Sequence, residues 1–283
     1  MKVPNRIKPL VEDGLVDEVI SRLMSGKEAD VFVVHSFGEI RCAKVYKESL
    51  QRGFKQAVQY QEGRKVKNTR RARAMERGSS YGRKQQEEVW QTAEVDALVK
   101  LAKTDVRVPE TFGCFEGVLL MELITDAEGH VAPRLADVSM TAEEAIQGHA
   151  TVMEYVKKML CVGMVHGDLS EFNVLVDELG PVIIDLPQAV DASANNQAEE
   201  MLIRDVRNIN NYYGQFAPQL LQNRSGHEMW ELYERAELYE DTLLTGIHAE
   251  DTHQADVDGV VSEIKSVLAE EAKRQERLRE AES

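Results

Sequence analysis

Three polar side chains in the middle of the sequence have the types and the spacing that phosphoryl transfer requires. Asp168 lies in the run His-Gly-Asp-Leu-Ser-Glu-Phe-Asn, Asn173 ends that run, and Asp185 follows twelve positions later, after an Ile-Ile pair. In this chemistry one carboxylate orients the attacking hydroxyl, while an amide oxygen and a second carboxylate hold a metal ion that neutralises the phosphates. We therefore predict Asp168 as the catalytic carboxylate and Asn173 and Asp185 as metal ligands.

Each of these residues also has a structural interpretation, in which the two Asp residues belong to turns and the Asn satisfies a loop backbone. Phosphoryl transfer is favoured because the chain supplies the upstream partners in the right order. Lys44, in the β-like run Ala-Lys-Val-Tyr, can clamp phosphates, and Glu94 is the candidate counter-charge that positions it. Taken alone, Lys44 would be typical of an edge strand. Lys44 and Glu94 are predicted to act with Asp168.

A loop over the phosphates is predicted just before the first β-like run. It has one glycine where ordinary protein kinases have three, and taken alone it is more typical of a simple β-turn. The residues predicted to bind the cofactor there are Ser25, Gly26, Lys27, Glu28 and Ala29. His166 is assigned a structural role, because phosphoryl transfer needs no imidazole.

The elements that would position these residues alternate along the chain. Residues 31–34 and 40–46 are β-like runs separated by a turn-prone segment, which predicts a hairpin. Residues 90–103 place apolar side chains at helical spacing, and residues 118–121 are typical of a buried strand. These elements would bring Lys44 opposite a helix.

The catalytic run follows a predicted long helix and precedes a predicted hairpin. The helix covers residues 141–161, with Thr141 as its N-cap and Glu144 three positions later completing a capping box. The hairpin joins residues 174–176 to residues 182–184. The hairpin would return Asp185 toward Asp168.

Composition indicates a globular protein of a reducing compartment. The chain has 283 residues and a net charge of −15. It has no apolar run approaching the roughly 18 residues that would span a bilayer, and its polar start lacks the apolar stretch of a signal peptide. Three cysteines without paired spacing predict neither a disulfide framework nor a zinc site. We expect a cytoplasmic protein without membrane contact.

Charge is distributed unevenly along the chain. Residues 47–86 carry a net charge of +9 and few aliphatic side chains, so they are predicted to form a flexible basic insert. Residues 225–283 carry a net charge of −10, with apolar residues at helical spacing. We expect an acidic helical extension there.

The motifs together resemble the RIO family of atypical serine/threonine protein kinases, particularly its type-one branch. The resemblance covers roughly residues 10–215. It rests on residues 24–31, 43–47, 90–101, 166–173, 183–185 and 204–213. It implies an α+β, bilobal protein-kinase-like fold with a small β-rich N-lobe and a mainly helical C-lobe, without a conventional activation segment.

The resemblance also implies domain limits and cofactors. The N-lobe would comprise residues 1–124 with the basic insert, the C-lobe residues 125–224, and the acidic extension residues 225–283. Family members are ATP-dependent serine kinases or ATPases, which implies ATP with magnesium, or manganese in its place. Met121 would lie at the back of the adenine pocket, and the hinge would run from Glu122 to Ile124.

Three residues are candidates for phosphorylation by this resemblance. Ser79 and Ser80 lie in the insert, where the family carries a loop that phosphorylates itself. Asp185 is a candidate phosphoaspartate in an ATPase cycle, although its simpler role is that of a metal ligand alone. After Asp185 the sequence Leu-Pro-Gln-Ala is less polar than the family pattern, which leaves the partners open.

Two other functions remain. A small-molecule kinase of the aminoglycoside or choline type would also use His-Gly-Asp, a downstream Asn and a strand-end Asp, but it requires neither the Ser-Gly-Lys-Glu-Ala loop nor the basic insert. An RNA-associated ATPase could contact ribosomal or other RNA through residues 64–65 and 70–73 of the basic insert, unless residues 228–258 of the acidic extension mask them. Family members act in ribosome maturation. The sequence names no protein substrate.

Overall fold

The computed structural model describes residues 3–26, 29–47 and 93–248. Residues 1–247 form one compact unit, and residues 248–283 form a second, which is described only at its first residue. In chain order the elements are α1 (Lys8–Glu12), β1 (Glu18–Ser25), β2 (Ala29–Ser36), β3 (Glu39–Tyr46), β4 (Thr111–Phe115), β5 (Val118–Glu122), η2 (Leu135–Asp137), α5 (Ala142–Cys161), β6 (Met164–Val165), β7 (Val174–Asp177), β8 (Gly180–Ile183), β9 (Val190–Asp191), α6 (Ala198–Tyr213), η3 (Pro218–Gln222) and α7 (Ser225–Glu234).

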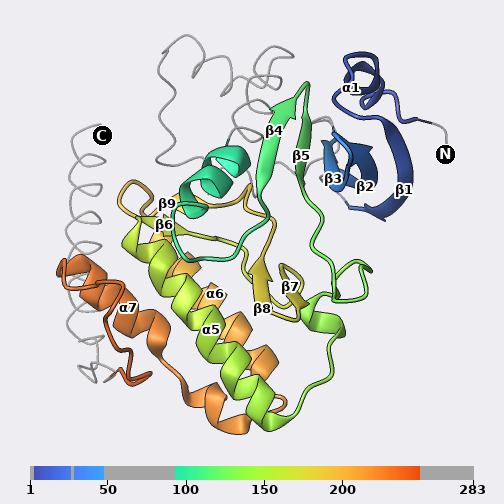
Figure 1. Cartoon of the computed structure of the whole chain (residues 1–283). Helices are drawn as coiled ribbons and strands as arrows, with labels where there is room; N and C mark the ends of the chain where they lie inside the picture. The colour runs from blue at the N-terminus through green and yellow to red at the C-terminus, as the bar shows by residue number, and fades with distance from the viewer. Residues whose placement is uncertain (1–2, 27–28, 48–92, 249–283) are drawn as a thin grey trace, which may run out of the picture. The chain divides into compact units, whose positions relative to one another are not determined.

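The N-terminal part is an antiparallel sheet with strand order β1-β2-β3-β5-β4 (Figure 1). The predicted β2–β3 hairpin is confirmed, with Ser36 paired to Glu39. The two residues between them, Phe37 and Gly38, have φ angles of 53° and 82°. Positive φ at both positions gives the tight turn whose twist matches that of the strands. Strand β1 was not predicted, because only Val19 of its eight residues is buried and no alternation marks it.

The two faces of this sheet have different roles. Phe32, Val34, Ala43 and Val45 point to one face, where they form a small apolar core with Leu10 of α1 and its neighbours. Side chains alternate along a strand, so the intervening residues of β2 and β3 face the other way. That opposite face carries the predicted lysine.

The long helix α5 begins as the sequence predicts. The Thr141 hydroxyl accepts from the Glu144 backbone N–H at 3.2 Å, and the Glu144 carboxylate accepts from the Thr141 N–H at 2.7 Å. This capping box satisfies donors that would otherwise be left open in the first turn. Helix α5 packs along α6, and a Cβ at Gly148 would lie only 2.8 Å from the Tyr213 hydroxyl. Glycine is thus required there for close approach of the helices.

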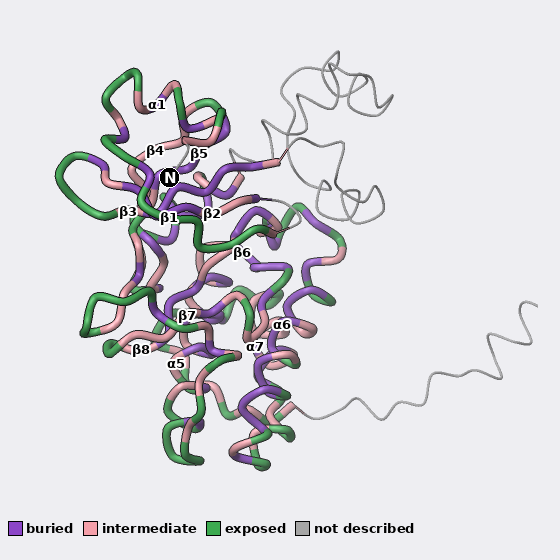
Figure 2. Tube along the Cα trace, turned by 90° about the vertical axis from the view of Figure 1, so that its right-hand side faces the viewer, coloured by how far each residue is buried: buried purple, intermediate pink, exposed green. Residues whose placement is uncertain are grey.

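The larger core lies among α5, α6 and the short strands (Figure 2). Strands β7 and β8 pair as a hairpin, as predicted, and β6 pairs with β9. Helix α7 packs against α5 and α6, and the segment after it returns to α5, where the Lys157 ammonium donates to the Thr242 carbonyl at 2.8 Å. Among the described helices, none combines the length and the apolar character needed to cross a bilayer.

Candidate active site

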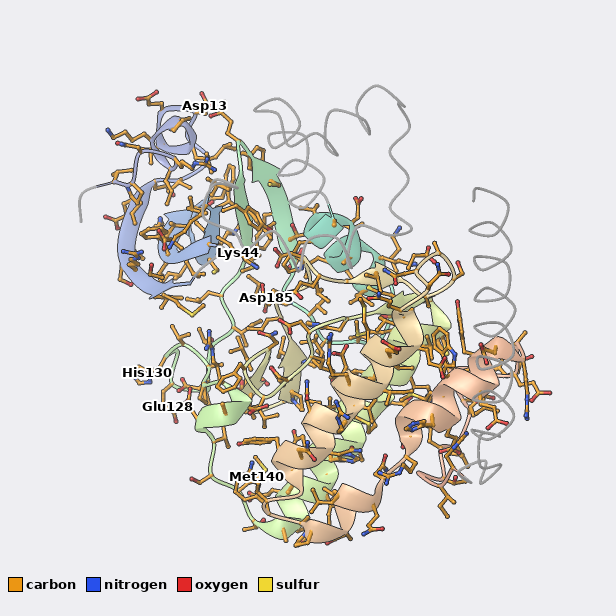
Figure 3. The ribbon with its side chains drawn as sticks, turned by 180° about the vertical axis from the view of Figure 1, so that it is seen from behind. Asp13, Lys44, Glu128, His130, Met140 and Asp185 are labelled. Atoms are coloured by element: carbon orange, nitrogen blue, oxygen red, sulfur yellow. The ribbon has the colours of Figure 1, made fainter. Side chains whose placement is uncertain are left out.

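A cavity of about 710 Å³ lies between the N-terminal sheet and the helical part of the first unit. Figure 3 shows Lys44 and Asp185 near each other there, although they come from segments far apart in the sequence. The predicted site residues that line it are Gly26, Ala29, Lys44, Glu94, Met121, Glu122, Ile124, Asp168, Asn173 and Asp185. The fold therefore brings together most of the set chosen from the sequence.

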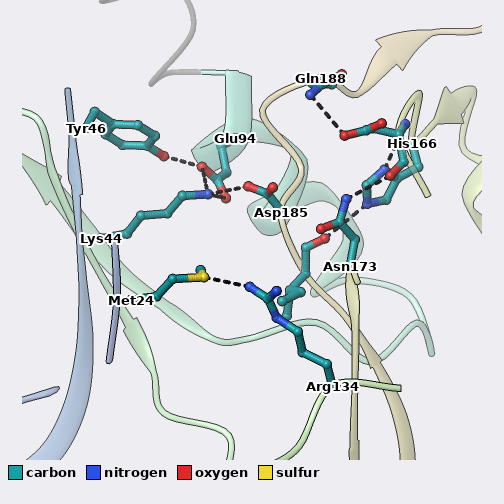
Figure 4. Close-up of polar contacts among 11 residues, drawn as sticks. Met24, Lys44, Tyr46, Glu94, Arg134, His166, Asn173, Asp185 and Gln188 are labelled. Atoms are coloured by element: carbon teal, nitrogen blue, oxygen red, sulfur yellow. Dashed lines mark hydrogen bonds and ion pairs between the residues drawn. The ribbon is translucent and has the colours of Figure 1, made fainter. Parts of the chain in front are cut away.

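The lysine has the partner that the sequence predicts. Lys44 Nζ donates to Glu94 Oε1 at 2.7 Å and to Oε2 at 2.9 Å, and both side chains are almost fully buried. Glu94 lies in the helical residues 93–101. A further contact comes from Tyr46 at the end of β3, whose hydroxyl donates to Glu94 Oε2 (Figure 4). Tyr46 and Lys44 therefore fix the Glu94 carboxylate from two directions.

Lys44 also reaches across the cavity to the second predicted carboxylate. Its Nζ donates to Asp185 Oδ1 at 2.6 Å. An ammonium has three donors, so Glu94 and Asp185 together occupy all of them. Burial by itself lowers the pKa of Lys44, but the charges of Asp185 and Glu94 outweigh it and raise that pKa. Lys44 is held in its charged form.

Asp185 has an unusual backbone conformation. It follows the end of β8 with a φ of 65°, in the left-handed region that non-glycine residues rarely adopt. Burial raises the pKa of its carboxyl, but the positive charge of Lys44 outweighs burial and the pKa is lowered. The carboxyl is therefore ionised and aimed into the cavity, as a ligand for a cation requires.

Asp168 and Asn173 are fixed by short-range contacts within the loop. Gln188 Nε2 donates to Asp168 Oδ2 at 3.1 Å, and Asn173 Nδ2 donates to the Asp168 backbone carbonyl at 2.8 Å. Desolvation raises the pKa of the Asp168 carboxyl, and the negative charge of Asp185 raises it further. These bonds leave Oδ1 of each side chain for a substrate or an ion.

His166 has the structural role predicted for it. Its Nδ1 accepts from the Asp168 N–H at 3.3 Å, and its Nε2 donates to the Ile184 carbonyl at 3.1 Å. Burial lowers the pKa of the imidazole, so it is neutral. The ring ties the loop that carries Asp168 to the strand end that carries Asp185.

Helix α6 anchors the same loop from below. The Asp205 carboxylate accepts from the N–H of Gly167 at 2.8 Å and of Leu169 at 3.0 Å, the two residues that flank Asp168. Burial raises the Asp205 pKa to about 7, against the lowering effect of these two donors. On the same helix, Arg204 donates to the Gly167 carbonyl and Asn208 donates to the Leu169 carbonyl at 3.0 Å.

The base of the predicted phosphate loop is closed by charged contacts. The Asp30 carboxylate accepts from Ser25 Oγ at 2.7 Å and from Arg22 at 2.6 Å, and Lys47 donates to the Gly26 carbonyl at 2.7 Å. Gly26 and Ala29 line the cavity, whereas Ser25 does not. The Ser25 hydroxyl is instead used to shape the loop.

Some predicted residues lie outside the described part of the chain, and some functional residues were missed. Lys27 and Glu28 of the loop, and Ser79 and Ser80 of the insert, belong to the first group. The missed residues are Tyr46, Gln188 and Asp205. Only the position of Tyr46 two residues after Lys44, on the same face of the strand, gave a usable signal.

A family model for the RIO domain matches residues 30–225, which is more than half of the chain. The chain belongs to the RIO family. The RIO-type serine/threonine-protein kinase Rio1 of Haloferax volcanii is 33% identical to this RIO chain over 208 residues, which are 73% of this chain and 67% of that protein.

Other RIO proteins agree. The serine/threonine-protein kinase rio1 of Schizosaccharomyces pombe is 29% identical over 210 residues, which span 72% of this chain and only 40% of that longer protein. The predicted membership of the RIO family, close to the type-one branch, is confirmed. The names of these relatives also support the prediction of a serine/threonine-protein kinase.

Solved structures confirm the fold. The Rio2 kinase of Chaetomium thermophilum, in a complex described as ADP/Mg²⁺-phosphoaspartate, aligns with a TM-score of 0.52 at 19% identity, covering 82% of this chain and 74% of that chain. Another structure of the same kinase aligns with a TM-score of 0.53 at 20% identity, covering 75% and 61%. The predicted α+β, kinase-like fold is therefore confirmed.

Proposed function

We propose that this RIO chain is an ATP- and magnesium-dependent phosphotransferase that phosphorylates serine, its own insert first, and that hydrolyses ATP when no acceptor is in place. One observation carries the proposal. Lys44 is ion-paired with both Glu94 and Asp185 in a cavity that Asp168 and Asn173 also line. A clamp for phosphates, a carboxylate for the acceptor and oxygen ligands for a cation are the parts that phosphoryl transfer needs.

The residues divide the reaction between them. On nucleotide binding, Lys44 would exchange its bond to Asp185 for bonds to the α- and β-phosphates, while Glu94, held in turn by Tyr46, keeps the ammonium in place. Asp168, held by Gln188 through one oxygen, would accept a hydrogen bond from the attacking hydroxyl through the other. The acceptor oxygen bonds to the γ-phosphorus, the bond to the β,γ-bridging oxygen breaks, and ADP leaves. The hydroxyl proton passes to Asp168 or to solvent.

The donor set fits magnesium. Asn173 uses its amide nitrogen in the bond to the Asp168 carbonyl, which leaves its oxygen, and Asp185 offers an ionised carboxylate in the same cavity. Magnesium prefers oxygen ligands and is usually held by one or two protein groups together with substrate phosphates. When bound, the ion supplies positive charge to the phosphate oxygens. Manganese takes the same kind of ligands.

Asp185 is also proposed as a transient phosphate acceptor in the ATPase cycle. Its ionised carboxylate and its position in the cavity support this role, and the Chaetomium Rio2 kinase was solved as a phosphoaspartate complex. A carboxylate oxygen would bond to the γ-phosphorus with loss of ADP, and water would then release phosphate. Hydroxylamine destroys an acyl phosphate, whereas phosphoserine survives it. If all protein-bound label in early-quenched samples resists hydroxylamine, Asp185 serves only as a ligand.

A role in ribosome or RNA-particle maturation belongs to the same proposal. The +9 charge of residues 47–86 supports contact with RNA phosphates. We expect binding of ribosomal RNA that weakens steeply as salt is raised. If the acidic extension masks the insert, deletion of residues 249–283 should strengthen RNA binding. Absence of RNA binding by both forms at low salt would remove this role.

The central experiment follows the label of γ-labelled ATP with magnesium. We expect label on the protein and as free phosphate, with Lys44→Ala reducing both by at least about 100-fold. Lys100→Ala is the matched control, because Lys100 is an exposed lysine of the same kind outside the cavity. Full activity of Lys44→Ala would contradict the proposal, and label on an added aminoglycoside or choline would favour the small-molecule kinase. Mass spectrometry then tests whether Ser79 or Ser80 carries the phosphate.

A further inference from the structure

Arg134 places a second cation in the cavity. It lies between Pro133 and η2, and its backbone forms an isolated bridge with Leu175 of β7. Its half-buried side chain lines the cavity. In Figure 4 the guanidinium of Arg134 points toward Met24. Arg134 therefore stands opposite the strand that leads into the phosphate loop.

Among the described residues, the guanidinium of Arg134 has one hydrogen-bond partner. Its Nη2 donates to the thioether sulfur of Met24 at 2.7 Å. A guanidinium has five donors, and a thioether is a weak acceptor. Within the described residues no carboxylate forms an ion pair with Arg134. A cation in a cavity without an anionic partner has binding capacity left for an anionic ligand.

The charges around the cavity point to which ligand that is. Its described lining includes five acidic residues, and of its two basic residues Lys44 is already matched by two carboxylates. Arg134 is the other basic residue, and it lines the same cavity as Asp185, the proposed metal ligand, where the phosphates of a bound nucleotide would lie.

We propose that Arg134 is a nucleotide-binding residue that exchanges its contact with Met24 for two hydrogen bonds to phosphate oxygens of the bound nucleotide. Phosphate matches the planar fork of a guanidinium, and Lys44 offers only a single point of charge. This role rests on the proposed nucleotide binding in the cavity. It gives the site a phosphate contact from the helical part of the unit, in addition to Lys44 from the sheet.

The test compares the binding of ADP and of adenosine by calorimetry, with magnesium present and with the full chain. For Arg134→Ala we expect ADP binding to weaken by about 10- to 100-fold, because charge-assisted hydrogen bonds are lost. Adenosine binding should change by less than about 2-fold, since adenosine has no phosphate. Arg134→Lys should recover part of the loss, and lowering the salt should strengthen ADP binding more in wild type than in Arg134→Ala.

Each outcome decides for or against the inference. Arg235→Ala removes an exposed arginine outside the cavity and should bind ADP as wild type does. Equal losses for ADP and adenosine would assign Arg134 to the ribose or to packing and overturn the phosphate contact. Unchanged ADP binding by Arg134→Ala and Arg134→Lys would overturn it as well. If the wild type binds no nucleotide, the proposed function fails together with it. Thermal unfolding without ligand shows whether the variants fold.

Discussion

Replacement of Asp205 by asparagine would weaken the hydrogen bonds that hold the catalytic loop and leave the residues that line the cavity unchanged. The carboxylate of Asp205 accepts from two backbone N–H groups, those of Gly167 and Leu169. An asparagine has one acceptor oxygen, and its amide would turn a donor toward the second N–H. That N–H would be left buried without a partner, which costs about 1–3 kcal/mol.

The cost should depend on pH in a definite direction. Burial raises the pKa of folded Asp205 from 3.8 to about 7, so between these values the folded protein holds a proton that the unfolded chain has lost. A raised folded pKa contributes stability that is present at low pH and is lost as pH rises through this window. Asp205→Asn does not titrate. We therefore expect its deficit to be largest near about pH 5 and smaller near about pH 8.

Urea unfolding at both pH values measures the deficit, with Glu200→Gln as the control. Glu200 is an exposed residue of α6, and the control makes the same change from carboxylate to amide. The transfer rate of Asp205→Asn should fall at saturating ATP, because one of the two bonds that flank Asp168 is lost, while ATP affinity stays near that of wild type. Equal stability near about pH 5, or a deficit that grows with pH, would refute the reasoning.

Three further changes test other parts of the structure. Asp168→Asn should lower transfer by about 100-fold or more and leave ATP affinity nearly intact, and unchanged transfer in a single-turnover assay would remove its assigned role. Tyr46→Phe removes the hydroxyl bonded to Glu94 and should cost about 1.5–3 kcal/mol in urea unfolding, together with a several-fold loss of transfer; wild-type values in both assays would show that Lys44 alone positions the carboxylate. Thr141→Ala breaks the capping box and should lower the free energy of unfolding by about 1 kcal/mol without changing ADP affinity, so a changed affinity would argue against a purely local effect.

The sequence determined the features that depend on neighbours along the chain. The spacing of Asp168, Asn173 and Asp185, together with the upstream Lys44 and Glu94, predicted phosphoryl transfer. One loop and one hairpin position the first three residues. The β2–β3 hairpin and the start of α5 were likewise predicted from short motifs, and the structure confirms both. Turn and cap chemistry is local, so it needs no knowledge of the fold.

Tertiary structure decided the contacts that join distant segments. Glu94 was only a candidate partner until the fold placed it 2.7 Å from Lys44, and Asp205 and Gln188 had no signal in the sequence. Strand β1 was missed for a related reason, since it is an edge strand with little buried surface. A carboxylate on a helix shows no pattern that reveals which backbone N–H groups it will meet. For Asp205, these N–H groups are determined by how α6 packs against the catalytic loop, and that packing depends on the whole chain.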